Sequence, residues 1–389
     1  MRKKVNVLQV QIGGPTFSGI SSYLFQQYKY IDRSQIRYDF LFFRENSMEL
    51  VSNDPVFTGS HFFTVNTRRK NSRSTNYRKI TEGLNKILET NDYDAVVVNT
   101  SILSVIMACL KAVKRFPKVK FIAHAHNTEL IVRKGAFRQR FGTIVKIIES
   151  LFRKRIRKEA YAMFACSTDA GAFTFGKKAI RMNNFMVVHN AIEIPEFQYN
   201  QQYRDEVREE LCAGENTVVI GNVGKLSIRK NQAFLIQVFS IIHRDHPDTQ
   251  LWLIGEGTDK EELVHLAEQL HLDHSVLFLG QKTDVNRYLQ GMDAYAFTTL
   301  TEGLGIAAIE AQAAGIPTII SDGVPDEVLI TPLAKKIALS EGVEKWAQEI
   351  QLMIENYNRH YDFTAALIQA GYDLESEGKR MTAYYLSLL

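Results

Sequence analysis

The chain has 389 residues, of which 45% are hydrophobic and only 8 are proline, a composition typical of soluble globular proteins and long enough for two domains. Its three cysteines, Cys109, Cys166 and Cys212, show no metal-ligand spacing, and so sparse and odd a set fits a reducing compartment. The start lacks the apolar region of a signal peptide and no window approaches the roughly 20 apolar residues of a membrane span, so we expect a cytoplasmic protein.

Charge divides the chain into two parts. The net charge is +4, but residues 1–200 carry +17 and residues 201–389 carry −13. This asymmetry predicts two domains with different partners. Neither an aromatic-rich basic strand nor a helix-turn-helix pattern occurs, so we expect no nucleic-acid partner.

In the first half, short β-branched segments alternate with helical ones, as in parallel α/β sheets. Strands are expected at residues 5–11, 38–43, 94–99, 118–126, 162–167 and 185–190. Ligands of such sheets bind beyond the carboxyl ends of the strands, where Gly14, His126 and Asn190 stand.

A basic amphipathic helix is expected within residues 133–160. Its apolar positions recur at helical spacing and its basic positions follow: Phe137, Phe141, Ile144, Ile148, Leu151 and Phe152, then Arg153, Lys154, Arg155, Arg157 and Lys158. Such a helix is typical of contact with a membrane surface. The same pattern fits a helix that packs its apolar face on the core and turns its basic face to solvent, and both interpretations stay open.

The pattern breaks at residues 194–202, and a second series of strands is expected at residues 217–224, 250–257, 275–281, 294–299 and 317–322. No G-x-G-x-x-G motif followed by a ribose-binding acid occurs, which disfavours a dinucleotide enzyme. Lys225 and Lys230 follow the first of these strands, in a turn that leads into a helix. Lysines in that place can neutralise a diphosphate, although solvent-facing lysines are common.

Residues 299–322 hold two glutamates, Glu302 and Glu310, on either side of a turn that opens an apolar helix. The amides about Gly305 and Ile306 lack intrahelical partners and form an anion site suited to a phosphate. If both glutamates were helical, they would lie roughly 12 Å apart at about 1.5 Å of rise per residue. A glycosidase pair needs roughly 5 to 9.5 Å, so we expect the two to hold different parts of one ligand.

The order of the motifs is specific: G-x-L-x-x-x-K-N from Gly224, then LIGEG, VLFLGQKTDV and EGLGIAAIEAQAAGIPTIISD. This order resembles the retaining family 4 glycosyltransferases of the GT-B fold, with Glu302 and Glu310 in the place of their E-x7-E motif. The segments VLQVQIGG, IAHAHNT and SDGVPDEV make the chain most similar to the bacterial capsular and exopolysaccharide transferases. The resemblance covers nearly the whole chain.

The resemblance implies an α/β fold of two Rossmann-like, doubly wound domains that face each other across a cleft. Residues 1–195 would form an N-terminal acceptor-binding domain and residues 196–375 a C-terminal domain that binds a nucleotide-sugar. Residues 376–389 would form a helix that crosses back to the first domain.

The resemblance also implies how the second domain would bind the nucleotide. Glu310 would hold the ribose hydroxyls, while Lys225 and Lys230 would hold the diphosphate. The backbone about Gly280 and Lys282 would meet the base. Lys225 stands where the family usually has an arginine, so it offers a point charge instead of a bidentate fork.

Around the transferred sugar, the resemblance implies that Glu302 orients the sugar and the β-phosphate together with three backbone amides, those of Leu304, Gly305 and Ile306. His126 matches the family histidine of the first domain, which faces the sugar near the anomeric carbon.

The loop after the first strand, with Gly14 and Gly19, would approach the β-phosphate. Ser18 stands there where a glycine pair is common in the family, and Ala191 replaces a glycine in the turn that follows Asn190.

The function implied is retaining, metal-independent transfer of a hexose or N-acetylhexosamine from a nucleotide-sugar, with UDP suggested by the resemblance alone and no cofactor beyond this donor. The acceptor would be an undecaprenyl-pyrophosphate-linked oligosaccharide of capsule or exopolysaccharide biosynthesis, so we expect a peripheral protein on the anionic inner face of the cell membrane. Two alternatives stay open: transfer to another acceptor, such as a protein, teichoic acid or glycolipid, and a non-catalytic GT-B subunit that stabilises a partner.

Overall fold

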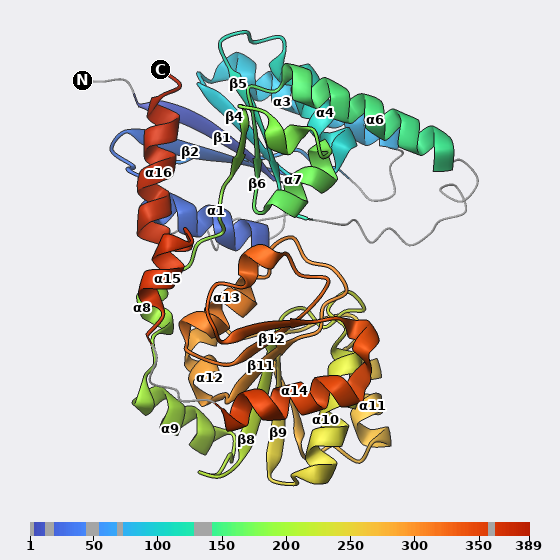
Figure 1. Ribbon diagram of the computed structural model, residues 1–389. Helices are drawn as coiled ribbons and strands as arrows, with labels where there is room; N and C mark the ends of the chain where they lie inside the picture. Colours follow the sequence, from blue (N-terminus) through green and yellow to red (C-terminus); the bar gives the residue numbers. More distant parts are fainter. Residues whose placement is uncertain (1–3, 12–18, 44–53, 68–72, 128–141, 357–361) are drawn as a thin grey trace. The chain divides into compact units, whose positions relative to one another are not determined.

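The computed structural model describes residues 4–11, 19–43, 54–67, 73–127, 142–356 and 362–389. The chain divides into two compact units. Unit 1 comprises Met1–Ala191 and Leu374–Leu389, and unit 2 comprises Ile192–Asp373. Each unit is built on one parallel sheet with helices on its faces (Figure 1).

The sheet of unit 1 has the strand order β3-β2-β1-β4-β5-β6-β7, and every pairing in it is parallel. Its strands are β1 (Val5–Gln11), β2 (Ile36–Phe42), β3 (Phe62–Thr64), β4 (Ala95–Asn99), β5 (Lys120–Ala125), β6 (Ala162–Ala165) and β7 (Phe185–Val187). Its helices are α1 (Gly19–Tyr30), α3 (Arg73–Thr90), α4 (Leu103–Val113), α6 (Gly142–Glu159), α7 (Thr168–Phe175) and α16 (Leu374–Leu386), with short 3-10 helices at η1 (Pro55–Phe57) and η2 (Ala179–Arg181).

Alternation along the strands places a polar cluster on one face of this sheet. Side chains two residues apart on a strand share a face, and Val7, Val97 and Ile122 belong to one core cluster with residues of α1 and α16. The same alternation puts Gln9, Asn99 and His124 on that face, one step nearer to the carboxyl ends of their strands. Helix α16 packs against α1 there (Figure 1).

The sheet of unit 2 has the order β10-β9-β8-β11-β12-β13 and is also parallel throughout. Its strands are β8 (Val218–Val223), β9 (Thr249–Ile254), β10 (Val276–Gly280), β11 (Ala294–Phe297), β12 (Thr318–Ser321) and β13 (Ala334–Ile337). Its helices are α8 (Ile194–Phe197), α9 (Gln201–Glu210), α10 (Gln232–Asp245), α11 (Lys260–Gln269), α12 (Val285–Gly291), α13 (Ile306–Ala313), α14 (Gly342–Glu355) and α15 (Thr364–Gln369), with 3-10 helices η3 (Asp326–Val328) and η4 (Leu339–Glu341).

The two doubly wound parallel sheets confirm the predicted α/β class, but the sequence did not predict β3 and β13. Both are short strands at the edge of a sheet, and β13 (AKKI) carries two lysines. Lysine on an edge strand is common because it hinders pairing with another chain, yet it hides the strand pattern. Within the residues that the structure describes, no helix is long and apolar enough to cross a membrane.

In each sheet the strand order reverses beside the first strand, at β1–β4 in unit 1 and at β8–β11 in unit 2. Ligands of open α/β sheets bind beyond the carboxyl ends of the strands at such switch points. Functional residues are therefore expected after β1, β4 and β5 in unit 1, and after β8 and β11 in unit 2.

Candidate functional site

A buried ion pair lies at the switch point of unit 2. Lys230, in the turn between β8 and α10, donates a short charge-assisted hydrogen bond to Oε2 of Glu302, in the loop after β11. The two side chains are only 12% and 13% exposed. Arg229 lies 3.7 Å from the other carboxylate oxygen, and the Lys230 ammonium lies 4.4 Å from the centroid of the Phe297 ring.

Burial and pairing act against each other in this pair. Burial alone would raise the pKa of Glu302, but Lys230, Arg229 and the Gly303 amide outweigh it and hold that pKa below its usual value. Burial lowers the pKa of Lys230, and the attraction of Glu302 offsets this only in part. The pair is thus ionised in a place poor in water, where added negative charge from a ligand would be strongly felt.

The amino terminus of α13 lies beside this pair. Gly305 precedes the helix with φ of +103°, and a Cβ there would lie 3.1 Å from the Phe297 ring, so the turn favours glycine. The Gly303 amide donates to Oε1 of Glu302 over 3.2 Å. In the described part of the chain, the amides of Leu304, Gly305 and Ile306 make no hydrogen bond, so the predicted anion site and Glu302 are brought together.

Glu310 lies in the second turn of α13 and has a different environment from Glu302. Its side chain is half-buried, and burial raises its pKa to about 7. Among the described residues it forms no ion pair. Helix α13 begins only at Ile306, so Glu302 is not helical and the spacing of roughly 12 Å worked from helical rise does not apply.

The remaining predicted residues of unit 2 are less closely grouped. Lys225 is exposed in the turn after β8. Gly280 ends β10 with φ of +69°, and its carbonyl accepts a hydrogen bond from the Gly255 amide over 2.8 Å. The Lys282 ammonium lies 4.6 Å from the centroid of the Tyr288 ring.

Gly257, the last residue of the LIGEG motif, supports the turn that carries Lys230. A Cβ on Gly257 would lie 1.8 Å from the carbonyl oxygen of Leu226. The IGEG segment therefore allows two backbone segments to touch, and this packing role explains its glycine better than direct ligand contact does.

In unit 1, His126 follows β5 and is held by buried polar groups. Its Nε2 lies 3.2 Å from Oδ1 of Asn99, at the end of β4, and its backbone amide donates to the Ser101 hydroxyl over 3.3 Å. The His124 ring lies 4.0 Å from the His126 ring between centroids, and the Tyr23 ring of α1 lies 5.4 Å from it. Burial lowers the pKa of His126 to about 3, so the ring is neutral near pH 7.

Sequence reasoning missed Asn99, Tyr23 and Gln9 as parts of this site. The available signal was a polar residue at the end of an otherwise apolar buried strand, as in AVVVN of β4 and VNVLQVQ of β1. Of the two predicted glycines of the first loop, Gly19 begins α1, and Gly14 lies outside the described residues.

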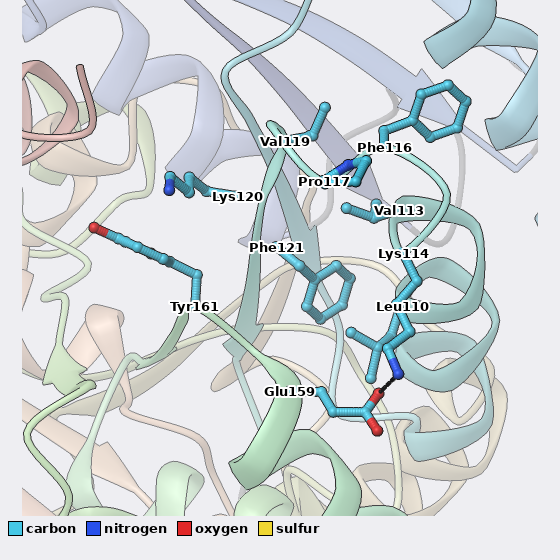
Figure 2. Close-up of a pocket in the computed structure, with 10 residues that line it drawn as sticks. All are labelled: Leu110, Val113, Lys114, Phe116, Pro117, Val119, Lys120, Phe121, Glu159 and Tyr161. Atoms are coloured by element: carbon cyan, nitrogen blue, oxygen red, sulfur yellow. Dashed lines mark ion pairs between the residues drawn. The ribbon is translucent and has the colours of Figure 1, made fainter.

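A shallow cavity of about 310 Å³ opens at the other edge of the unit 1 sheet, where β5 and β6 begin (Figure 2). An ion pair of 2.9 Å between Lys114 and Glu159 spans one side of it. Its lining comprises Leu110, Val113, Lys114, Phe116, Pro117, Val119, Lys120, Phe121, Glu159 and Tyr161. None of the predicted site residues takes part, because those lie at the carboxyl ends of the strands.

Helix α6 bears an exposed apolar ridge. Four large apolar side chains at helical spacing are between 43% and 59% exposed: Ile144, Ile147, Ile148 and Leu151. The alternative in which the helix packs its apolar face on the core is therefore wrong for Ile144, Ile148 and Leu151. The basic positions have divided roles, because Arg153 and Arg157 donate to backbone carbonyls at the end of α7.

Residues 203–372 match the family model of glycosyl transferases group 1. The chain is 27% identical over 379 residues to EpsF of Bacillus subtilis (strain 168), assigned as a glycosyltransferase, with 97% of this chain and 95% of EpsF covered. It is 21% identical over 322 residues to the Escherichia coli UDP-Gal:alpha-D-GlcNAc-diphosphoundecaprenol alpha-1,3-galactosyltransferase, with 82% of this chain and 80% of that protein covered.

Among solved structures, Anabaena Alr3699/HepE in complex with UDP matches with a TM-score of 0.75 at 17% identity, over 99% of this chain and 100% of that one. Sucrose-phosphate synthase from Thermosynechococcus elongatus matches with a TM-score of 0.78 at 15% identity, over 99% of each chain. At such identities the likeness shows that the fold is shared.

Proposed function

The chain is a glycosyltransferase of the GT-B fold related to bacterial exopolysaccharide enzymes, and from that premise we propose its donor, mechanism and acceptor. It transfers a hexose or N-acetylhexosamine from a UDP-sugar, with retention of configuration, to a lipid-linked oligosaccharide of capsule or exopolysaccharide biosynthesis. The observation that carries the proposal is the buried Lys230–Glu302 pair beside the uncommitted first-turn amides of α13.

In this proposal, unit 2 binds the nucleotide. The diphosphate takes the amides at the start of α13 and the ammonium of Lys230, with Lys225 as a second, exposed cation. Glu310 accepts hydrogen bonds from the ribose hydroxyls, and the backbone of Gly280 and Lys282 meets the base. A UDP donor is supported by the structures of the neighbour HepE, which include complexes with UDP and with UDP-glucose.

Negative charge gathers on the leaving UDP as the bond to the sugar breaks. Lys230 and the amides of α13 are fixed before the reaction, so they stabilise this charge without reorganisation and without a metal ion. Glu302, already held by Lys230 and the Gly303 amide, orients the sugar and forms no covalent bond to it. The acceptor attacks from the face that UDP leaves, and the departing phosphate takes its proton.

The proposed acceptor class rests on the relative from Escherichia coli, whose own substrate is linked to diphosphoundecaprenol. An acceptor of this kind lies in a membrane, so we also propose peripheral binding to an anionic bilayer through α6. The ridge of Ile144, Ile147, Ile148 and Leu151 would enter the headgroup region. Exposed Lys154 and Lys158 continue the same side of the helix and would meet the lipid phosphates.

The donor site is tested by measuring release of UDP from a panel of UDP-sugars by the purified full-length protein. Lys230→Ala and Glu302→Ala should each lower turnover by roughly 100-fold or more, as loss of a preorganised group in a charged transition state does. Lys335→Ala is the matched control, because it breaks another lysine–glutamate pair of unit 2, to Glu349. Absence of binding and turnover with every donor would overturn the proposal in favour of a non-catalytic subunit.

Membrane binding is tested by sedimentation with vesicles of phosphatidylglycerol at low salt. Ile147→Asp should abolish binding, whereas Ile368→Asp, at an exposed apolar position of unit 2, should not. Binding should also weaken with added salt and be absent with phosphatidylcholine alone. If Ile147→Asp bound like the unchanged protein, α6 would not be the contact.

A further inference from the structure

The amide of Asn99 has one orientation. Its Nδ2 donates to Oε1 of Gln9 over 2.9 Å and lies 3.4 Å from the backbone carbonyl oxygens of Val10 and Val97. Backbone carbonyl oxygens can only accept hydrogen bonds, so the nitrogen must be on their side. Oδ1 of Asn99 therefore faces His126.

This orientation determines which ring nitrogen of His126 carries the proton. Oδ1 of Asn99 is an acceptor, so Nε2 of His126, 3.2 Å away, must be the donor. The ring is neutral because burial lowers its pKa to about 3, which leaves Nδ1 with a bare lone pair. Within the described part of the chain, this buried Nδ1 has no hydrogen-bond partner.

A buried acceptor without a partner is costly and uncommon in native proteins. The neighbouring rings do not satisfy it: Tyr23 and His124 pack against His126 as aromatic rings, and no hydrogen bond joins either of them to Nδ1. A neutral nitrogen lone pair attracts a hydroxyl hydrogen and repels phosphate oxygens. The partner that fits is therefore an uncharged hydroxyl group.

We propose that Asn99 is a positioning residue that holds His126 as the Nε2–H tautomer, so that Nδ1 accepts a hydrogen bond from a hydroxyl of the transferred sugar. The role of the sugar rests on the proposed function, whereas the tautomer is a property of the free protein. His126 then contributes to donor selection as a fixed acceptor and carries no proton in the reaction.

The tautomer is tested by long-range proton–nitrogen correlation spectra of the full-length protein labelled with ¹⁵N-histidine, with His126 assigned through His126→Gln. The free protein should show a protonated Nε2 and an unprotonated Nδ1 near pH 7. Asn99→Leu should lose this preference and show both tautomers, and Asn99→Asp, which again presents an acceptor, should keep Nε2 protonated. Asn85→Ala is the control, because it removes another buried asparagine of unit 1 and should leave the His126 signals unchanged.

Kinetics connect the tautomer to the sugar. Asn99→Leu should raise the KM for the donor about tenfold, which corresponds to about 1.4 kcal/mol, with a smaller change in kcat. A donor whose sugar lacks the hydroxyl that binds Nδ1 should have a higher KM than the parent donor with the unchanged protein. With Asn99→Leu, the two donors should have the same KM. The KM of Asn99→Asp should lie between that of Asn99→Leu and that of the unchanged protein.

Two results would refute different parts of the proposal. A protonated Nδ1 in the free protein would overturn the inference whatever the enzyme does with donors. The expected tautomer in a protein that binds and turns over no nucleotide-sugar would instead refute the proposed function and, with it, the assignment of the sugar hydroxyl.

Discussion

Replacing Lys230 with methionine isolates the electrostatic part of the buried pair, because methionine keeps the length and the apolar stem of lysine. Glu302, only 13% exposed, would then still have the Arg229 guanidinium 3.7 Å from its carboxylate. Removing one partner of a buried pair costs about 3 to 5 kcal/mol. Because Arg229 is partly exposed and remains, we expect Lys230→Met to lower the free energy of unfolding of unit 2 by about 2 to 3 kcal/mol at pH 7.

The loss of stability in Lys230→Met should depend on pH. In the unchanged protein the pKa of Glu302 is lowered, so the pair stabilises the fold above the usual carboxyl pKa and loses this effect as the pH falls through the lowered value. Without Lys230, burial becomes the dominant influence and raises the pKa of Glu302. The variant is then most destabilised at neutral pH, and the difference shrinks towards about pH 4.5, where Glu302 takes up a proton.

Urea unfolding followed by tryptophan fluorescence is the assay, since both tryptophans, Trp252 and Trp346, are buried in unit 2. A double-mutant cycle of Lys230→Met with Glu302→Gln should give a coupling free energy of about 2 kcal/mol. Lys335→Met should cost less than about 1 kcal/mol, since Lys335 is half exposed. Equal losses at pH 5 and pH 7, or additivity in the cycle, would refute the reasoning.

Three further predictions concern the same unit. Glu310→Gln should raise the free energy of unfolding by about 3 kcal/mol at pH 8 and hardly at pH 4.5, because the pKa of Glu310 is raised to about 7 and its ionisation destabilises the fold. The same variant should weaken UDP binding in calorimetry. Gly305→Ala should cost about 1 to 2 kcal/mol in thermal unfolding and lower kcat/KM, whereas Gly59→Ala, also at positive φ but in open space, should affect stability alone. Chelation with EDTA should leave turnover unchanged, and a loss restored by Mg²⁺ would contradict a reaction that relies on Lys230 and backbone amides.

Most of the strands that the sequence predicted lie inside a sheet, where continuous apolar runs such as VNVLQVQ and AVVVN leave little ambiguity. β7 and β10 also lie at sheet edges but were predicted, because they belong to the longer runs of residues 185–190 and 275–281, whereas β3 and β13 were missed. Their sequences, FFT and AKKI, are three and four residues long and fall below what periodicity can resolve.

The residues of the candidate site also divide into those that the sequence predicted and those that it missed. Lys230, Glu302 and the amides of α13 were predictable because a linear motif carries each of them. Asn99 and Gln9 were not, since they are 90 positions apart and meet only through the pairing of β1 with β4.

The basic residues of α6 show the converse limit of sequence reasoning. Arg153, Arg157 and Lys158 look alike in the sequence, yet the two arginines bond to carbonyl oxygens at the end of α7. Arginine at the carboxyl end of a neighbouring helix stabilises that helix, so a basic cluster overstates the charge that a membrane would meet.

The two glutamates of α13 and its preceding loop are kept in different protonation states by their surroundings. Lys230 holds Glu302 ionised, so it can accept hydrogen bonds from a sugar hydroxyl at any pH above the usual carboxyl range. No cation of the described residues pairs with Glu310, and its pKa is raised to about 7, so near neutral pH part of the protein carries it protonated. A ribose diol that donates two hydrogen bonds favours the ionised form, so binding of the nucleotide should release a proton from Glu310. Affinity for UDP should then rise with pH between about 6 and 8, in the opposite direction to the stability of the free protein.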